Sequence, residues 1–173
     1  MATTYVEADA NTTATVMAVM ELYHKRLSDI GLTVKVLFAH APRDKNGDAI
    51  PPAIKIRGRG ATSKIDITTL KGRSAGLADS VLFLDGDEWH VCANQEQQAI
   101  IDQRLTELDV VLDSEGAVKR DDLGRPKLKR RVADFAVEGF VEVAERHREH
   151  SEEVKAVQAL GTQFVRQGLL AGF

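Results

Sequence analysis

Apolar residues near the start of the chain recur at alternating steps of four and three, which is the spacing of one face of an α-helix. These positions are Val16, Met20, Tyr23, Leu27 and Ile30. Gly31 follows at the position where glycine commonly ends a helix. The pattern therefore predicts one helix that Gly31 closes and that covers a hydrophobic core with this face.

Several short segments have the composition of β-strands. Residues 32–39 are rich in β-branched side chains and predict a strand. Residues 54–57 and 65–68 alternate between isoleucine and polar residues, which predicts two half-exposed strands flanking the glycine turn at 58–60. We expect these two strands to form a hairpin. A further short apolar strand is predicted over residues 80–84.

A second helix is predicted from Asn94. Asn94 and Gln97 have the spacing of a capping box, in which each side chain hydrogen-bonds to backbone at the helix start. The inward-facing positions, at steps of four and three, are Ile101, Leu105 and Leu108. Gln103 and Glu107, four residues apart, share a neighbouring face of the helix.

The last third of the chain combines a hairpin with two helices. Turn residues at 114–116 and 124–126 predict a hairpin followed by a basic segment. From residue 133 the apolar spacing becomes helical again, and Ser151 is a suitable N-cap for a final helix. Apolar residues remain near the end of that helix, which predicts that it mediates self-association; they are Leu169, Leu170 and Phe173.

The order of predicted elements is helix, sheet, helix, hairpin, helix and helix. Because strands and helices do not alternate as βαβ units, this order predicts the α+β class, with a small antiparallel sheet packed against helices. At 173 residues the chain is long enough for one compact domain. We expect that domain to span residues 1–150 and a C-terminal helical extension to span 151–173.

The composition is that of a globular protein in water, with 43% hydrophobic and 28% charged residues. A formal net charge of -3 argues against a generally basic nucleic-acid-binding protein. Cys92 is the only cysteine, and the first residues lack the pattern of a secretion signal. No apolar run is long enough to cross a membrane. These features predict a reducing, cytoplasmic location without membrane association.

Four segments carry a resemblance to a known family: LKGRSAGLADSVLFLDGDEW, AIIDQRLTEL, VKRDDLGRPKLKRR and ADFAVEGF. Together they resemble the metallopeptidase domain found in bacteriophages, which is similar to the small SprT-like zinc peptidases. The resemblance covers residues 34–147, and its most specific parts are the GDEW turn, the helix and the RDDLGRPKL hairpin. It implies a zincin-like fold, a phage origin and action in the host cytoplasm.

In that family the helix carries an H-E-x-x-H motif, whose two histidines bind zinc and whose glutamate activates a water molecule. The resemblance places these three positions at Gln103, Arg104 and Glu107, and a third histidine at Ala133. Among these four residues only Glu107 has a side chain suited to bind zinc. A unit charge on Arg104 about 6 Å from a dication costs roughly 5 kcal/mol at an effective dielectric constant near 20. The sequence therefore predicts neither a metal, a cofactor nor catalysis.

Two other pairs of side chains are candidate metal ligands. His147 and His150 are three residues apart in a helical segment, and His90 lies close to Cys92. The surroundings of His147 are polar throughout, which is typical of solvated histidines, and a single cysteine near a strand-to-helix turn is usually buried. The residues at the family's zinc-motif positions can instead have a structural role, because Arg104 can pair with Glu107 three residues later.

Two predicted hairpins are rich in basic residues, the side chains that contact phosphate groups in nucleic acids. The candidate binding residues are Arg57, Arg59, Lys127, Lys129, Arg130 and Arg131. No aromatic residue is interleaved with them for base stacking, and alternating charges are common on exposed strands. The leading hypothesis is therefore a catalytically inactive metallopeptidase-like protein that binds a host or phage protein. The alternatives are a nucleic-acid-associated accessory protein and a residual metal-dependent hydrolase.

Overall fold

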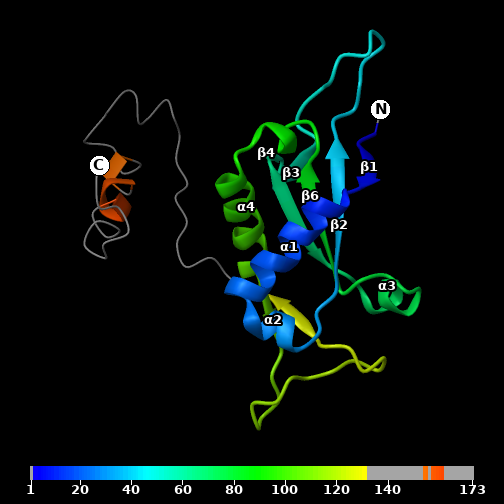
Figure 1. Cartoon of the computed structure of the whole chain (residues 1–173), viewed down its shortest axis with the longest axis vertical. Coiled ribbons are helices and arrows are strands. Elements are labelled where there is room, and N and C mark those ends of the chain that lie inside the picture. Colours follow the sequence, from blue (N-terminus) through cyan, green and yellow to red (C-terminus); the bar gives the residue numbers. More distant parts are fainter. Residues whose placement is uncertain (1, 132–153, 156, 162–173) are drawn as a thin grey trace. The chain divides into compact units, whose positions relative to one another are not determined.

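The structure, a computed structural model, describes residues 2–131, 154–155 and 157–161. The chain divides into two compact units, Met1–Val132 and Ala133–Phe173. Figure 1 shows the elements of the first unit, which are β1 (Thr4–Glu7), α1 (Ala10–Tyr23), α2 (Lys25–Asp29), β2 (Val34–His40), β3 (Ile54–Ile56), β4 (Arg59–Ala61), β5 (Ser63–Ile67), α3 (Leu70–Ser74), β6 (Ser80–Asp85), η1 (Trp89–Val91), α4 (Asn94–Thr106), β7 (Leu108–Val110) and β8 (Leu128–Arg130).

The main sheet has four strands in the order β1-β2-β6-β5. The α+β class predicted from the sequence is confirmed. The sheet is mixed, however, because β2 and β6 are parallel while the two outer pairs are antiparallel. The expectation of a wholly antiparallel sheet is therefore wrong for the central pair. The long connection from residue 41 to 79 returns the chain to the starting end of β2, so β6 runs in the same direction.

The predicted hairpin between residues 54–57 and 65–68 is also wrong in its partners. β3 pairs with β4, and the turn between them contains Arg57 and Gly58, both with positive φ (49° and 80°). This two-residue turn matches the twist of a tight hairpin. Residues 63–67 instead pair with β6, which leaves Ile65 completely buried. Burial of Ile65 in the main core explains why this strand leaves the hairpin.

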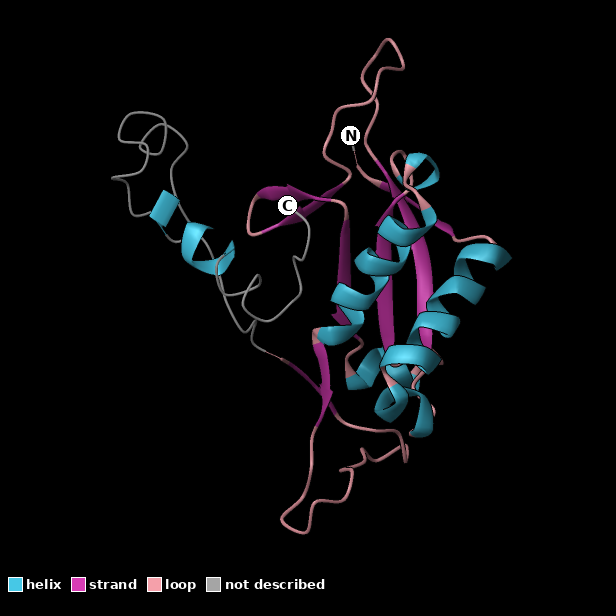
Figure 2. Cartoon of the chain, turned by 60° about the vertical axis from the view of Figure 1, so that its left-hand side comes forward, coloured by secondary structure: helices cyan, strands magenta, loops and turns pink. Residues whose placement is uncertain are grey.

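Two helices, α1 and α4, lie side by side over one face of the main sheet (Figure 2). Ile101 and Leu105 of α4 are buried, as their spacing predicts. Leu108 is buried too, but it lies in β7 rather than on the predicted helix face. From α1 the main core receives Val16 and Met20, together with Val19, which the predicted stripe omits. The apolar stripe therefore identified most of the helix faces that build the core.

The first predicted helix is interrupted at His24, so it forms α1 and α2 rather than one helix. The backbone of His24 leaves the helical region (φ -121°, ψ 46°), and its N–H still donates to the carbonyl of Met20. Leu27 remains buried, but Tyr23 is 60% exposed and does not belong to the core. The break turns the imidazole of His24 toward α4.

The start of α4 is at Asn94, yet the predicted capping box is absent. The N-cap residue is Ala93, and no side chain caps the first turn. The amide of Gln97 donates instead to the carbonyl of Trp89 at 2.9 Å. The chain therefore enters α4 directly from η1, and Gln97 ties these two elements together.

The hairpin predicted after β7 is confirmed, with β7 and β8 paired at its base. Its two turns share one construction: one oxygen of Asp113 or Asp121 accepts from the backbone N–H groups two and four residues later. Asp44 does the same in the loop between β2 and β3. These aspartates stabilise the turns without help from other elements.

In the second unit, residues 154–155 and 157–161 are helical. The helix predicted from residue 133, the boundary predicted at residue 150 and the apolar residues 169, 170 and 173 lie outside the described residues. No helix in the described part of the chain is long and apolar enough to cross a membrane.

Candidate functional site

The three motif positions on α4 have different surroundings. The side chain of Gln103 is exposed to solvent, whereas those of Arg104 and Glu107 are 14% and 28% exposed. Nε of Arg104 donates to the hydroxyl of Ser63, the first residue of β5, at 2.8 Å. Nη1 of Arg104 donates to Oε1 of Glu107, which confirms the pairing predicted from their spacing. Arg104 thus joins α4 to the edge of the main sheet.

Arg130 on β8 completes this arrangement. Its Nη1 donates to Oε2 of Glu107 at 2.7 Å, and its Nη2 lies 3.1 Å from Oδ1 of Asp66. The same Nη2 also donates to the backbone carbonyl of Ile65, on the side of β5 that faces away from β6. We call Asp66, Arg104, Glu107 and Arg130 the charge network. It connects α4, β5 and β8 through alternating cations and anions.

The residues at these positions do not fit a tetrahedral zinc site. Both carboxylate oxygens of Glu107 accept from guanidinium groups, and the amide of Gln103 is a poor zinc ligand. Zinc at this place would also stand beside two guanidinium charges. Among the described residues, no three His, Cys, Asp or Glu side chains gather as a metal site. The fourth motif position, Ala133, lies outside the described residues.

Residues 7–165 match the model of a family described as "Putative phage metallopeptidase". The chain belongs to this family. The match extends the resemblance seen in the sequence on both sides. No curated protein and no solved structure matches the chain.

The GDEW segment typical of the phage metallopeptidase resemblance has a structural role here. The imidazole of His40 lies over Gly86, where a Cβ atom would come within 2.4 Å of the ring. The two oxygens of Asp87 accept from Nδ1 of His40 at 2.9 Å and from the backbone of Ala41 at 2.8 Å. The hydrogen bond from His40 has the largest effect on the pKa of Asp87, followed by that from Ala41. Together they hold this pKa below its ordinary value. Trp89 is buried and joins the core.

The RDDLGRPKL hairpin is fixed to the domain by a buried arginine on α3. Nη1 of Arg73 lies 3.0 Å from Oδ2 of Asp121 and donates to the carbonyl of Pro126 at 2.9 Å. Its Nε lies 3.8 Å from Oδ1 of Asp79, which also pairs with Arg125 at 3.5 Å. All three of Arg73, Asp79 and Asp121 have side chains no more than 7% exposed. Arg73 therefore holds the hairpin in place.

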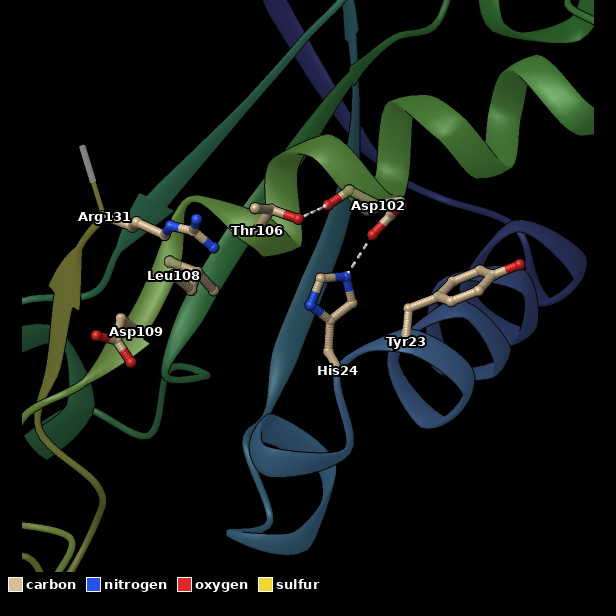
Figure 3. Close-up of a pocket in the computed structure, with 7 residues that line it drawn as sticks. All are labelled: Tyr23, His24, Asp102, Thr106, Leu108, Asp109 and Arg131. Carbon is tan, nitrogen blue, oxygen red and sulfur yellow. Dashed lines mark hydrogen bonds and ion pairs between the residues drawn. The ribbon is translucent and has the colours of Figure 1, made fainter. Parts of the chain in front are cut away.

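A pocket of about 470 Å³ lies on the neighbouring face of α4 (Figure 3). It is lined by Tyr23, His24, Asp102, Thr106, Leu108, Asp109 and Arg131. Nε2 of His24 lies 2.7 Å from Oδ1 of Asp102. None of Gln103, Arg104 and Glu107 lines this pocket; Arg104 and Glu107 belong to the charge network, and Gln103 is exposed to solvent. Sequence reasoning missed this pair because its members are 78 residues apart and no motif links them.

The six candidate basic residues are exposed, but two of them form ion pairs with carboxylates. Lys129 lies 3.2 Å from Asp109, and Arg130 belongs to the charge network. Burial raises the pKa of Asp109, but Lys129 and the backbone N–H of Val110 outweigh it, so this pKa lies below its ordinary value. Arg131 lines the pocket. Arg57 and Arg59 belong to the β3–β4 hairpin, which is a separate sheet from β7–β8.

The other proposed metal ligands have different partners. The ring of His90 packs edge to face against Phe38, with centroids 5.3 Å apart. The thiol of Cys92 donates to the carbonyl of Glu88 at 3.6 Å, and burial raises its pKa. His147 and His150 lie outside the described residues.

Proposed function

We propose that this member of the phage metallopeptidase family acts by binding a host protein rather than by metal-dependent hydrolysis. The observation that carries the proposal is the pair of guanidinium groups on Glu107. A catalytic zinc needs three protein ligands and an open position for water. Here both oxygens of the one carboxylate at the motif positions accept from Arg104 and Arg130. The segments around GDEW and RDDLGRPKL are held to the domain by hydrogen bonds.

Metal analysis tests the first half of the proposal. The full-length chain is purified without a histidine tag, incubated with a slight excess of zinc, desalted and analysed for metal per chain. We expect well under one zinc per chain, and no cleavage of an unstructured casein substrate in the presence of zinc. A stoichiometric zinc that survives desalting, together with cleavage that a chelator abolishes, would overturn the proposal.

Affinity capture tests the second half. The full chain is immobilised and exposed to host lysate, beside an unrelated acidic protein of similar size as control. We expect one host protein at stoichiometric level on this chain alone, and binding of the purified pair to be measurable by calorimetry. If the folded chain retains no host protein above the control, protein binding is the wrong function.

Nucleic-acid association is the second candidate, and the exposure of the six basic residues is what favours it. The carboxylates of Asp109 and Asp66 already neutralise Lys129 and Arg130, which weakens the case. Mobility shifts at increasing salt separate the two candidates, because neutralised phosphates give a steep loss of affinity with salt. A steep salt dependence at low protein concentration would favour this candidate over protein binding.

A further inference from the structure

The pocket beside α4 contains two carboxylates with different partners. Asp109 lies 3.5 Å from Arg26 and 3.2 Å from Lys129, so fixed cations already neutralise it. Asp102 is 44% exposed, and in the described part of the chain it forms no salt bridge with a lysine or arginine. Its charged partner is His24, which is not a permanent cation. Asp102 is therefore the carboxylate of this pocket that can still take a cation.

His24 holds one oxygen of this carboxylate. Its side chain is only 12% exposed, and Nε2 lies 2.7 Å from Oδ1 of Asp102. A carboxylate accepts, so the N–H at Nε2 donates to Oδ1. Figure 3 shows Nδ1 on the side of the ring turned away from Asp102 and Tyr23. Among the hydrogen bonds of the described residues, the second oxygen of Asp102 has no donor.

The wall next to this pair is aromatic. Tyr23 precedes His24 at the end of α1, and its side chain lines the same pocket beside Asp102 (Figure 3). The face of an aromatic ring attracts a cation, and its edge packs against an alkyl chain. Arg131 and Asp109 stand at the other end of the pocket (Figure 3). One end of the pocket therefore combines a carboxylate, which His24 holds in place, and an aromatic side chain.

We propose that this end of the pocket binds a basic side chain, a lysine or an arginine, presented by the protein partner. Its N–H groups donate to the second oxygen of Asp102, and its alkyl stem packs against Tyr23. This inference rests on the proposed function, since it states what the pocket takes from the partner. An acidic side chain would need donors at this end, where the carboxylate of Asp102 would repel it. The pocket thus specifies the charge of the group that enters it.

A titration with small probes tests the assignment without the partner. The probes are Nα-acetyl-lysine methylamide and Nα-acetyl-arginine methylamide, and Nα-acetyl-glutamate methylamide is the acidic comparison. The readout is the imidazole resonance of His24 in the full chain, which has five histidines, assigned with the variant His24→Gln. We expect saturable shifts with at least one basic probe at roughly millimolar concentration, as one side chain supplies little binding energy.

Two matched variants on α4 make the test specific. Asp102→Asn keeps the size of the side chain and removes the charge, and we expect it to weaken the binding of the basic probe about tenfold. Glu96→Gln removes the same charge from an exposed position of α4 outside the pocket and should bind as the unaltered chain does.

Preferential shifts with the acidic probe, equal weakening by both variants, or no saturable shift with any probe would each overturn the assignment. Such failure is distinguishable from failure of the proposed function, because capture of a host protein by the same chain would still be observed.

Discussion

Arg104 and Glu107, one turn apart on α4, are joined by a hydrogen bond between guanidinium and carboxylate. The sequence resemblance assigns these positions to the catalytic glutamate and the second zinc-binding histidine of the H-E-x-x-H motif. The second oxygen of Glu107 accepts from Arg130 on β8, so the pair is tied to another element. Where the motif would hold a metal cation, this chain has two cationic side chains and one anion that they share.

Replacing Glu107 by glutamine tests the stabilising role of the charge network. The amide keeps the shape but loses the charge to which Arg104 and Arg130 donate, so two guanidinium groups face each other. We expect the free energy of unfolding to fall by about 1 kcal/mol, since charge-assisted hydrogen bonds at a partly exposed site are worth little more. Urea unfolding measures the change. Glu115→Gln, at an exposed turn, is the control and should have almost no effect.

Restoring the motif tests whether the cations prevent zinc binding. The variant Q103H/R104E/E107H places two histidines four residues apart and removes one guanidinium group from the site. We expect this variant to bind zinc measurably in a calorimetric titration, although weakly, because two protein ligands are fewer than a catalytic site uses. The variant Q103H/E107H keeps Arg104 and should bind zinc less well. Equal affinity in the two variants would show that Arg104 does not oppose the metal.

Sequence reasoning located the helices and strands well where periodicity alone decides. Ile101 and Leu105 are buried as their spacing on α4 predicts, and the pairing of Arg104 with Glu107 follows from a local spacing of three. The family membership came from segments such as GDEW whose residues are fixed by packing. Local patterns were therefore sufficient for the class of fold and for half of the charge network.

The remainder depends on contacts between distant residues. Nothing in the sequence near Arg130 indicates that it reaches Glu107, 23 residues earlier, or the carbonyl of Ile65. The apolar spacing likewise gives no sign of the helix break at His24. The break positions a polar side chain that pairs with Asp102, which is distant in the sequence. The predicted pairing of residues 54–57 with 65–68 is wrong for the same reason. The burial of Ile65 against β6 outweighs the proximity of the glycine turn.

Gly86 is predicted to be intolerant of a larger side chain. An added Cβ atom would lie 2.4 Å from Cε1 and 2.7 Å from Nε2 of His40, so the ring must move away. We expect Gly86→Ala to displace His40, break its hydrogen bond to Asp87 and lower stability by about 1–2 kcal/mol. Thermal unfolding and the imidazole resonances of His40 report the two effects. Gly161→Ala, where an added Cβ atom meets nothing within 4 Å beyond its chain neighbours and its own helix backbone, is the control for the substitution itself.

The lowered pKa of Asp87 predicts a pH-dependent contribution to stability. Its cause is the hydrogen bond from His40, followed by that from the backbone of Ala41, and its ordinary value is 3.8. A carboxyl group whose pKa is lower when folded stabilises the protein above the unfolded value and loses this effect as pH falls through the folded value. The deficit of Asp87→Asn relative to the unaltered chain should therefore be greatest near about pH 5 and shrink below 3.8.

Urea unfolding of both proteins between about pH 5 and pH 2.5 measures this deficit. Asp122→Asn, at an exposed position of the hairpin, is the charge-matched comparison. A deficit that stays constant over the whole range would show that the ionised form of Asp87 is not what the folded state stabilises.

Arg73 is expected to be the most sensitive of the charged residues considered. It is 5% exposed and is the cation nearest to the buried carboxylate of Asp121, while it also lies 3.8 Å from Asp79. Replacing it by methionine keeps most of the volume but leaves these carboxylates buried without that charge. Because an uncompensated buried charge is costly, we expect a loss of about 3–5 kcal/mol in the free energy of unfolding.

Two further variants separate the charge effect from a simple loss of packing. Lys71→Met, at an exposed position of the same helix α3, should change stability by less than about 0.5 kcal/mol. Adding Asp121→Asn to Arg73→Met removes one of the unpaired charges, while an asparagine oxygen still accepts from the backbone of Leu123 and Arg125. The double variant should therefore be more stable than Arg73→Met alone. If it is less stable, the cost at Arg73 comes from its hydrogen bond to Pro126 and its packing, and the buried charge is not the cause.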